Sequence, residues 1–172
     1  NCTSAFFSNV YTAKGREQIT EVSFDAQSPQ MNYSIQIYKN VTNKSDPQSG
    51  TPALKTPITG TCITEGLYTV PVSELVYLDP GERYSIVVEL LCPPNGNMAM
   101  ATESNFTGWY NTIANITPYQ SFSRGNDERY WTDANTYSCC YRINAHTKNS
   151  NVKKVTFKDS TGKVIDSQYI QP

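Results

Sequence analysis

The chain has 172 residues and a formal net charge of −1, with 38% hydrophobic and 17% charged residues. This length is enough for one domain with a core of its own. The near-zero charge, without a basic stripe, argues against nucleic acid as a partner, and the lack of a run of about 18 apolar residues argues against membrane insertion. The chain is instead rich in uncharged polar residues and tyrosine, namely Ser, Thr, Asn, Gln and Tyr. Such a composition is typical of a secreted β-protein.

The first third of the chain alternates polar and apolar residues with a period of two. Residues 9–24 show short runs of this kind, and in residues 31–38 every second residue from Met31 to Ile37 is apolar. This alternation predicts half-buried strands. Residues 40–60 are polar and contain three prolines. We expect them to form a loop, because proline blocks regular strand pairing.

Two further strands are predicted at residues 66–72 and 83–90, with a short segment at 75–78 between them. A turn follows at 79–82, where Pro80 presets φ and Gly81 tolerates a positive φ. From Tyr84 to Leu90 every second residue is apolar, so this is the strongest strand signal in the chain. Another strand is expected to begin near residue 98.

The second half of the chain is less regular. Residues 103–135 are expected to be irregular, and residues 137–145 to form a strand that directs Cys139 into the core and Cys140 outward. Residues 155–170 read as a β-hairpin around a DSTG turn. The pattern predicts an all-β fold, an antiparallel β-sandwich over residues 1–147, followed by a linker and hairpin at 148–172. The hairpin either packs on the sandwich or begins a next module.

The five cysteines and one histidine give no catalytic or zinc motif. No CxxC pair is present, which argues against zinc. The cysteines are interpreted mainly as buried small hydrophobes, with a Cys62–Cys92 disulfide as the alternative. On one strand, His146 and Cys140 would lie about 20 Å apart, too far for a nucleophile and its base. We therefore expect the chain not to be an enzyme.

Residues 109–120 are the candidate ligand-binding segment. Aromatic rings stack on the apolar faces of sugars, amides bind the hydroxyl groups, and loops held by a rigid sandwich are common binding sites. The alternative is that Trp109 or Tyr110 plugs the end of the sandwich. The candidate ligand-binding residues are Trp109, Tyr110, Asn111, Tyr119 and Gln120.

The segment at 125–135 is the candidate metal site. Its acidic and amide side chains supply the oxygen ligands that Ca²⁺ prefers, without EF-hand spacing. The candidate ligands are Asn126, Asp127 and Asp133. The alternative is a solvated acidic loop. Trp131, in the same segment, is interpreted as a core or edge-packing residue.

The order of several segments resembles a known family. These are NVYTAKGREQITEVSF, YSIQIYKN, GLYTVPVSELVYLDPGERYSIVVEL, ESN, QSFSRGNDERYWTD and YRINAHT, over roughly residues 8–147. They resemble the lectin-like domain found beside papain-like cysteine peptidases in cell-surface proteins of anaerobic, clostridial-type bacteria. The resemblance implies a jelly-roll-like sandwich similar to carbohydrate-binding modules, a cell-surface or cell-wall location, and a structural calcium. VTFKDSTGKVIDSQYI resembles the opening of a repeat of Gram-positive surface proteins.

Three functions remain open from the sequence. The first is a non-catalytic, extracellular lectin-like module that binds glycan or cell-wall polymer, or docks against neighbouring domains. The second is an adhesin or spacer module that contacts host or neighbouring proteins without binding sugar. The third is a fragment of a viral or eukaryotic glycoprotein, suggested only by six Asn-x-Ser/Thr sequons. Because the chain does not begin with Met, we expect it to be a mature or excised piece of a longer protein.

Overall fold

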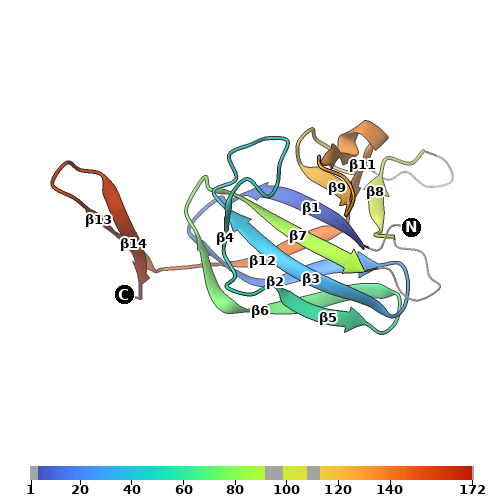
Figure 1. Cartoon of the computed structure of the whole chain (residues 1–172), viewed down its shortest axis with the longest axis horizontal. Helices are drawn as coiled ribbons and strands as arrows, with labels where there is room; N and C mark the ends of the chain where they lie inside the picture. Colours follow the sequence, from blue (N-terminus) through green and yellow to red (C-terminus); the bar gives the residue numbers. More distant parts are fainter. Residues whose placement is uncertain (1–3, 92–98, 108–112, 172) are drawn as a thin grey trace.

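The computed structural model describes residues 4–91, 99–107 and 113–171. These residues form an all-β structure, which confirms the predicted antiparallel β-sandwich (Figure 1). No helix among them is long and apolar enough to cross a membrane. The elements are β1 (Ser4–Thr12), β2 (Glu17–Ala26), β3 (Met31–Lys39), β4 (Thr51–Pro52), β5 (Ile58–Cys62), β6 (Gly66–Leu78), β7 (Arg83–Leu91), β8 (Thr102–Ser104), β9 (Ser121–Gly125), β10 (Thr132–Asp133), the 3-10 helix η1 (Ala134–Tyr137), β11 (Cys139–Tyr141), β12 (Ile143–Asn149), β13 (Lys153–Lys158) and β14 (Val164–Ile170).

Two antiparallel sheets make up the sandwich. The larger has seven strands in the order β10-β9-β1-β7-β3-β4, with β5 also paired to β3. The smaller has the order β12-β2-β6, and the short pair β11–β8 stands beside them. Strand pairing brings distant segments together: Ser8 on β1 is opposite both Val87 on β7 and Phe122 on β9.

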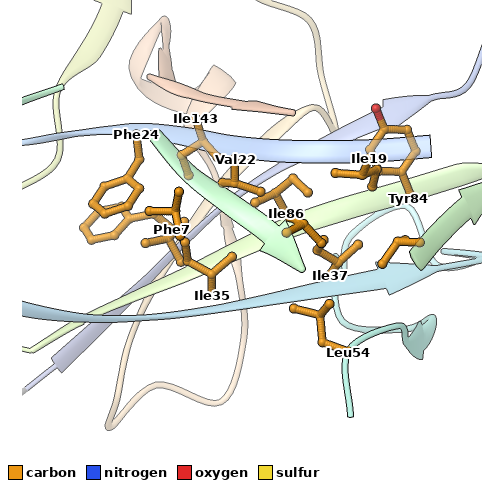
Figure 2. Packing of buried hydrophobic residues seen from close by; sticks show 14 of the residues in the cluster. Phe7, Ile19, Val22, Phe24, Ile35, Ile37, Leu54, Tyr84, Ile86 and Ile143 are labelled. Carbon is orange, nitrogen blue, oxygen red and sulfur yellow. The ribbon is translucent and has the colours of Figure 1, made fainter. Parts of the chain in front are cut away.

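The main core lies between the two sheets. Val22 and Phe24 from the smaller sheet face Ile35 and Ile86 from the larger one, and all four are fully buried (Figure 2). The period-two assignment of these strands is therefore confirmed. Burying one side chain of this size contributes roughly 1.5–3 kcal/mol to folding. The predicted turn before β7 is also present, with a hydrogen bond of 3.0 Å from Glu82 N to Asp79 O and a φ of 77° at Gly81.

The prediction of one continuous strand over residues 137–145 is wrong. Tyr137 is the last residue of η1. The rest of the segment divides into β11, which pairs with β8, and β12, which pairs with β2. The cysteine assignment is reversed as a consequence: Cys140 is buried, with 7% of its surface exposed. Cys139 lies half-buried beside η1, with its Sγ 3.7 Å from Ala134 O.

Several strands lie in segments that the sequence predicts to be irregular. β4 lies inside the predicted 40–60 loop and β5 begins at its end, and both pair with β3. β9 and β10 lie inside 103–135, and β9 pairs with β1. The partners β3 and β1 are far away in the sequence. Tertiary pairing therefore stabilises them, although their own residues give a weak strand signal.

The predicted C-terminal hairpin is confirmed as β13 and β14, and it projects from one end of the sandwich (Figure 1). Asp159 Oδ1 holds its turn by accepting hydrogen bonds from the backbone N–H groups of Thr161 (2.9 Å) and Lys163 (3.0 Å). The hairpin contacts the sandwich through Tyr169, whose ring centroid lies 5.1 Å from that of Tyr77 on β6. The division of the chain near residue 147 stays a prediction.

Candidate ligand-binding site

Two of the predicted ligand-binding residues lie at the entry to β9. Tyr119 is 45% exposed and has a φ of 64°. Gln120 accepts a hydrogen bond of 2.7 Å through its carbonyl from Val10 N on β1. These contacts fix the path of the chain into β9 and leave the Tyr119 ring at the surface. Trp109, Tyr110 and Asn111 lie outside the described residues.

The predicted calcium ligands are only partly available to an ion. Asp133 accepts a hydrogen bond from Tyr119 N (2.7 Å) on one carboxylate oxygen and from Asn135 N (3.0 Å) on the other. Its carboxylate therefore caps the N-terminus of η1. Through the bond to Tyr119 it also links the predicted metal site to the predicted ligand-binding segment. Asn126 and Asp127 are exposed in the turn after β9. Among the described residues no group of three His, Cys, Asp or Glu side chains could hold a metal. Calcium stays a prediction.

The outer face of the larger sheet carries a different candidate site, which we call the outer trough. It consists of two hollows of about 160 and 350 Å³ that share Gln48. The first lies over β1, β3 and β7, and the second lies between the loop at 41–50 and the segment at 124–131. The first is lined by Phe6, Ser34, Gln36, Tyr38, Gln48, Pro57, Val87 and Glu89, and the second by Asn43, Ser45, Asp46, Gln48, Arg124, Arg129, Tyr130 and Trp131.

Hydrogen bonds hold the loop at 41–50 against the outer face of the sheet. Ser85 Oγ donates to Pro47 O (2.5 Å). Gln48 donates to the Tyr38 hydroxyl (3.0 Å) through its side-chain amide. At the end of the loop, a Cβ on Gly50 would lie 2.1 Å from Lys39 O, so only glycine fits there. One wall of the outer trough is thus a loop with a fixed conformation.

Arg124 lines the second hollow of the outer trough and lies beside two aromatic rings. It is the cross-strand partner of Phe6, and its guanidinium carbon lies 4.7 Å from the Phe6 ring centroid and 5.1 Å from that of Trp131. The two rings meet edge to face at 6.3 Å. Trp131 is half-buried against Val10, Val41 and Phe122, so it packs at the edge of a small second core. The edge-packing interpretation of Trp131 is confirmed.

A further hollow of about 540 Å³ lies beside β8 and β11. Phe106 and Ile113, on either side of the predicted segment 109–111, line it together with Arg142. Arg142 is occupied by two carboxylates, those of Asp25 (2.6 Å) and Glu103 (3.6 Å). The cation of this hollow is therefore already paired within the protein.

Comparison with known proteins decides the family. The family described as "Lectin like domain" matches residues 1–153. The chain belongs to this lectin-like family. No curated protein matches it. One similar solved structure, at 25% identity and a TM-score of 0.68, is that of the cysteine protease and lectin-like domains of Cwp84, a surface layer associated protein of Clostridium difficile. Another is the clostridial cysteine protease Cwp84 after propeptide cleavage, at 26% identity and the same TM-score.

The lectin-like domain covers only part of these relatives. In both comparisons 86% of this chain is matched, against 33% and 36% of the solved chains. The match therefore concerns about a third of each relative. The matched domain is the lectin-like part of these relatives, not their protease domain.

The three thiols that the structure describes are poor nucleophiles. Burial raises the pKa of Cys62 to about 11, and burial also raises the pKa values of Cys139 and Cys140. All three are free thiols, protonated at neutral pH. His146 is exposed on β12, as predicted, with its Nε2 2.9 Å from Ser23 Oγ. Cys92 lies outside the described residues.

Most residues of the outer trough could not be predicted from the sequence. Phe6, Gln48 and Arg124 come from segments that become neighbours only through the strand order. The local signal is SFSRG at 121–125, whose alternation places Phe122 and Arg124 on one face. This short pattern is too weak to predict β9 by itself, and it says nothing of the pairing with β1.

Proposed function

We propose that the chain is a non-catalytic accessory module of an extracellular cell-surface protein, and that it binds a glycan or cell-wall polymer in the outer trough. The observation that carries this proposal is the set of aromatic and amide side chains that line the two hollows, from the sheet and from the loops beside it. Trp131 and Tyr130 supply rings for stacking, and the amides of Gln48 and Asn43 lie in the same hollow. Pockets with a few placed polar groups among aromatic walls are typical ligand sites.

The cell-surface setting is supported by the relatives. Cwp84 is described as a surface layer associated protein that combines a cysteine protease with a lectin-like domain. We propose a similar setting for this chain, with neighbouring domains of the same protein as further partners. The predicted loop residues Trp109 to Asn111, with Tyr119 and Gln120, are a second proposed contact surface, and calcium is proposed as a structural ion.

A binding assay on soluble cell-wall polysaccharides tests this function. Trp131→Ala and Tyr130→Ala should each weaken binding about tenfold or more, because each removes a ring that lines the outer trough. Tyr137→Ala is the matched control, since Tyr137 is 65% exposed on η1 and does not line the trough. Circular dichroism must show that the variants are folded. Absence of binding by the wild type to any saccharide, or equal binding by all three variants, would contradict the proposal.

The hairpin favours a second candidate function, that of an adhesin or spacer that holds or contacts other proteins without binding sugar. The Tyr169 ring packs against Tyr77 at an interplanar angle of 43°, and the ammonium groups of Lys39 and Lys154 lie 5.2 and 5.6 Å from its centroid. Such a fixed junction suits a chain of modules. Tyr169→Ala should then loosen the contact between the hairpin and the sandwich. It should leave glycan binding in the outer trough unchanged, so the two functions can be tested separately.

A further inference from the structure

We infer that the ligand of the outer trough is a saccharide that carries an oxyanion, a carboxylate or a phosphodiester, and that Arg124 and Arg129 bind this group. The inference rests on the proposed function, because it names the class of glycan bound at the same site. It follows from the position of Arg124, from the carboxylates around it, and from the shape of the second hollow.

The Arg124 guanidinium lies beside two aromatic rings and has few hydrogen bonds in its own plane. Its carbon is 4.7 Å from the Phe6 ring centroid and 5.1 Å from that of Trp131, and because the two centroids are only 6.3 Å apart, the rings do not enclose it on opposite sides. In the plane, Nη2 donates one long hydrogen bond of 3.4 Å to Gln48 Oε1, and Nε is buried without a hydrogen-bond partner among the described residues. A guanidinium has five N–H donors, and a planar oxyanion can accept two of them at once.

The arginines of the outer trough are not neutralised by the protein. Among the arginines, two form ion pairs, Arg16 and Arg142. Arg124 and Arg129 form none with another described residue, and neither does Arg83. An unpaired, partly buried cation beside a hollow is costly unless a ligand or solvent compensates it. This is the arrangement expected of a site that receives its counter-charge from a ligand.

The nearby carboxylates are used to fold the loops. Asp46 Oδ1 accepts a hydrogen bond of 2.8 Å from Gln48 N, and Glu128 Oε2 accepts one of 3.0 Å from Gly125 N. Glu89 lines the other hollow, over β7. Asp46 keeps its charge and lines the hollow of about 350 Å³, so this hollow holds two arginines against one carboxylate, and the oxyanion is placed there beside Arg124 and Arg129. Neutral sugar rings of the same ligand would extend over Gln36 and Tyr38.

Matched pairs of polysaccharides test the inference by titration calorimetry on the whole chain. Polygalacturonate is compared with its methyl ester, and yeast phosphomannan with the same mannan after removal of phosphate. Each pair differs mainly in the oxyanion, and the two pairs distinguish a carboxylate from a phosphodiester. We expect at least one charged polymer to bind about tenfold or more tightly than its neutral partner, with binding that weakens as salt is raised.

Two arginine variants locate the contact. Arg124→Gln and Arg129→Gln should each remove most of the preference for the charged polymer, while Lys148→Gln, the same charge change on the exposed face of β12, should keep it. Arg129 is exposed, so its variant remains informative if Arg124→Gln disturbs packing. Equal binding of charged and neutral polymers, still abolished by Trp131→Ala, would overturn the oxyanion inference and keep the glycan function. No binding of any polymer would overturn both.

Discussion

Asn9 joins the two sheets, and replacing it by aspartate should destabilise the fold in a pH-dependent way. Its buried amide nitrogen donates to Tyr141 O (2.8 Å) and Ile143 O (2.9 Å), at the junction of β11 and β12. Ile143 O also accepts from the Tyr11 hydroxyl. Asn9→Asp keeps the shape but removes both amide donors. Losing a hydrogen bond to a buried carbonyl costs about 1–3 kcal/mol.

The charge of the new side chain adds a larger cost at neutral pH. A buried carboxylate that faces two carbonyl oxygens would have a raised pKa, so the folded variant binds a proton that the unfolded chain releases above about pH 4. Stability then falls as pH rises, by about 1.4 kcal/mol per pH unit up to the raised pKa. We expect a deficit of about 1 kcal/mol at pH 4 and about 3–4 kcal/mol at pH 7.

Urea denaturation of the variant and the wild type, compared at pH 4, 5.5 and 7, measures this deficit. Asn144→Asp is the matched control, because Asn144 is exposed on β12. Its free energy of unfolding should lie within about 0.5 kcal/mol of the wild-type value at each pH. The reasoning is refuted if the two variants lose the same stability at pH 7, or if the Asn9→Asp deficit does not shrink on acidification.

Three further predictions concern the core, the hairpin junction and the thiols. Phe24→Ala removes a fully buried ring packed on Tyr33 and Tyr68, so it should lower the free energy of unfolding in urea by about 3–5 kcal/mol, while Leu75→Ala, 68% exposed, should change it by less than about 0.5 kcal/mol. Burial raises the pKa of Asp79, but the hydrogen bond and charge of Lys154, with the charge of Arg16, outweigh burial and lower it overall. Its stabilisation is therefore present above about pH 4 and is lost as pH falls through the lowered pKa, so the difference in Tm between wild type and Asp79→Asn should be present at pH 6 and close below pH 4. Iodoacetamide at pH 8 should leave the Cys62 peptide unlabelled in mass spectra of the folded protein and label it in urea, and fast native labelling would contradict the burial of this thiol.

Strands that face the main core on one side could be predicted from the sequence. Ile35, Ile86 and Val88 sit at alternate positions of long runs, and all three are fully buried in the structure. β5 and β9 could not be predicted in this way, because their short segments contain few large apolar residues. Their positions depend on hydrogen bonds to β3 and β1, partners that the local pattern does not reveal.

The outer trough was harder to predict for the same reason. In residues 109–120 aromatic and amide residues are adjacent in sequence. In the trough the equivalent groups come from β1, from β3, from the loop at 41–50, and from Tyr130 and Trp131 after β9. The strand order β9-β1-β7-β3 brings these segments together. Periodicity predicts which face of a strand is buried, but it does not predict which strands are neighbours.

Small buried side chains on the outer face of the larger sheet explain how a loop and an open trough can share that face. Ser8 and Ser85 are fully buried there, on neighbouring strands. Side chains of this size let the loop at 41–50 approach the strands closely enough for Ser85 to donate to Pro47 O. Larger residues flank this contact, with Val10 and Phe122 on one side forming the second small core. The loop is therefore fixed at its base by the sheet, and Asn43 and Gln48 extend from it into the trough as preorganised groups.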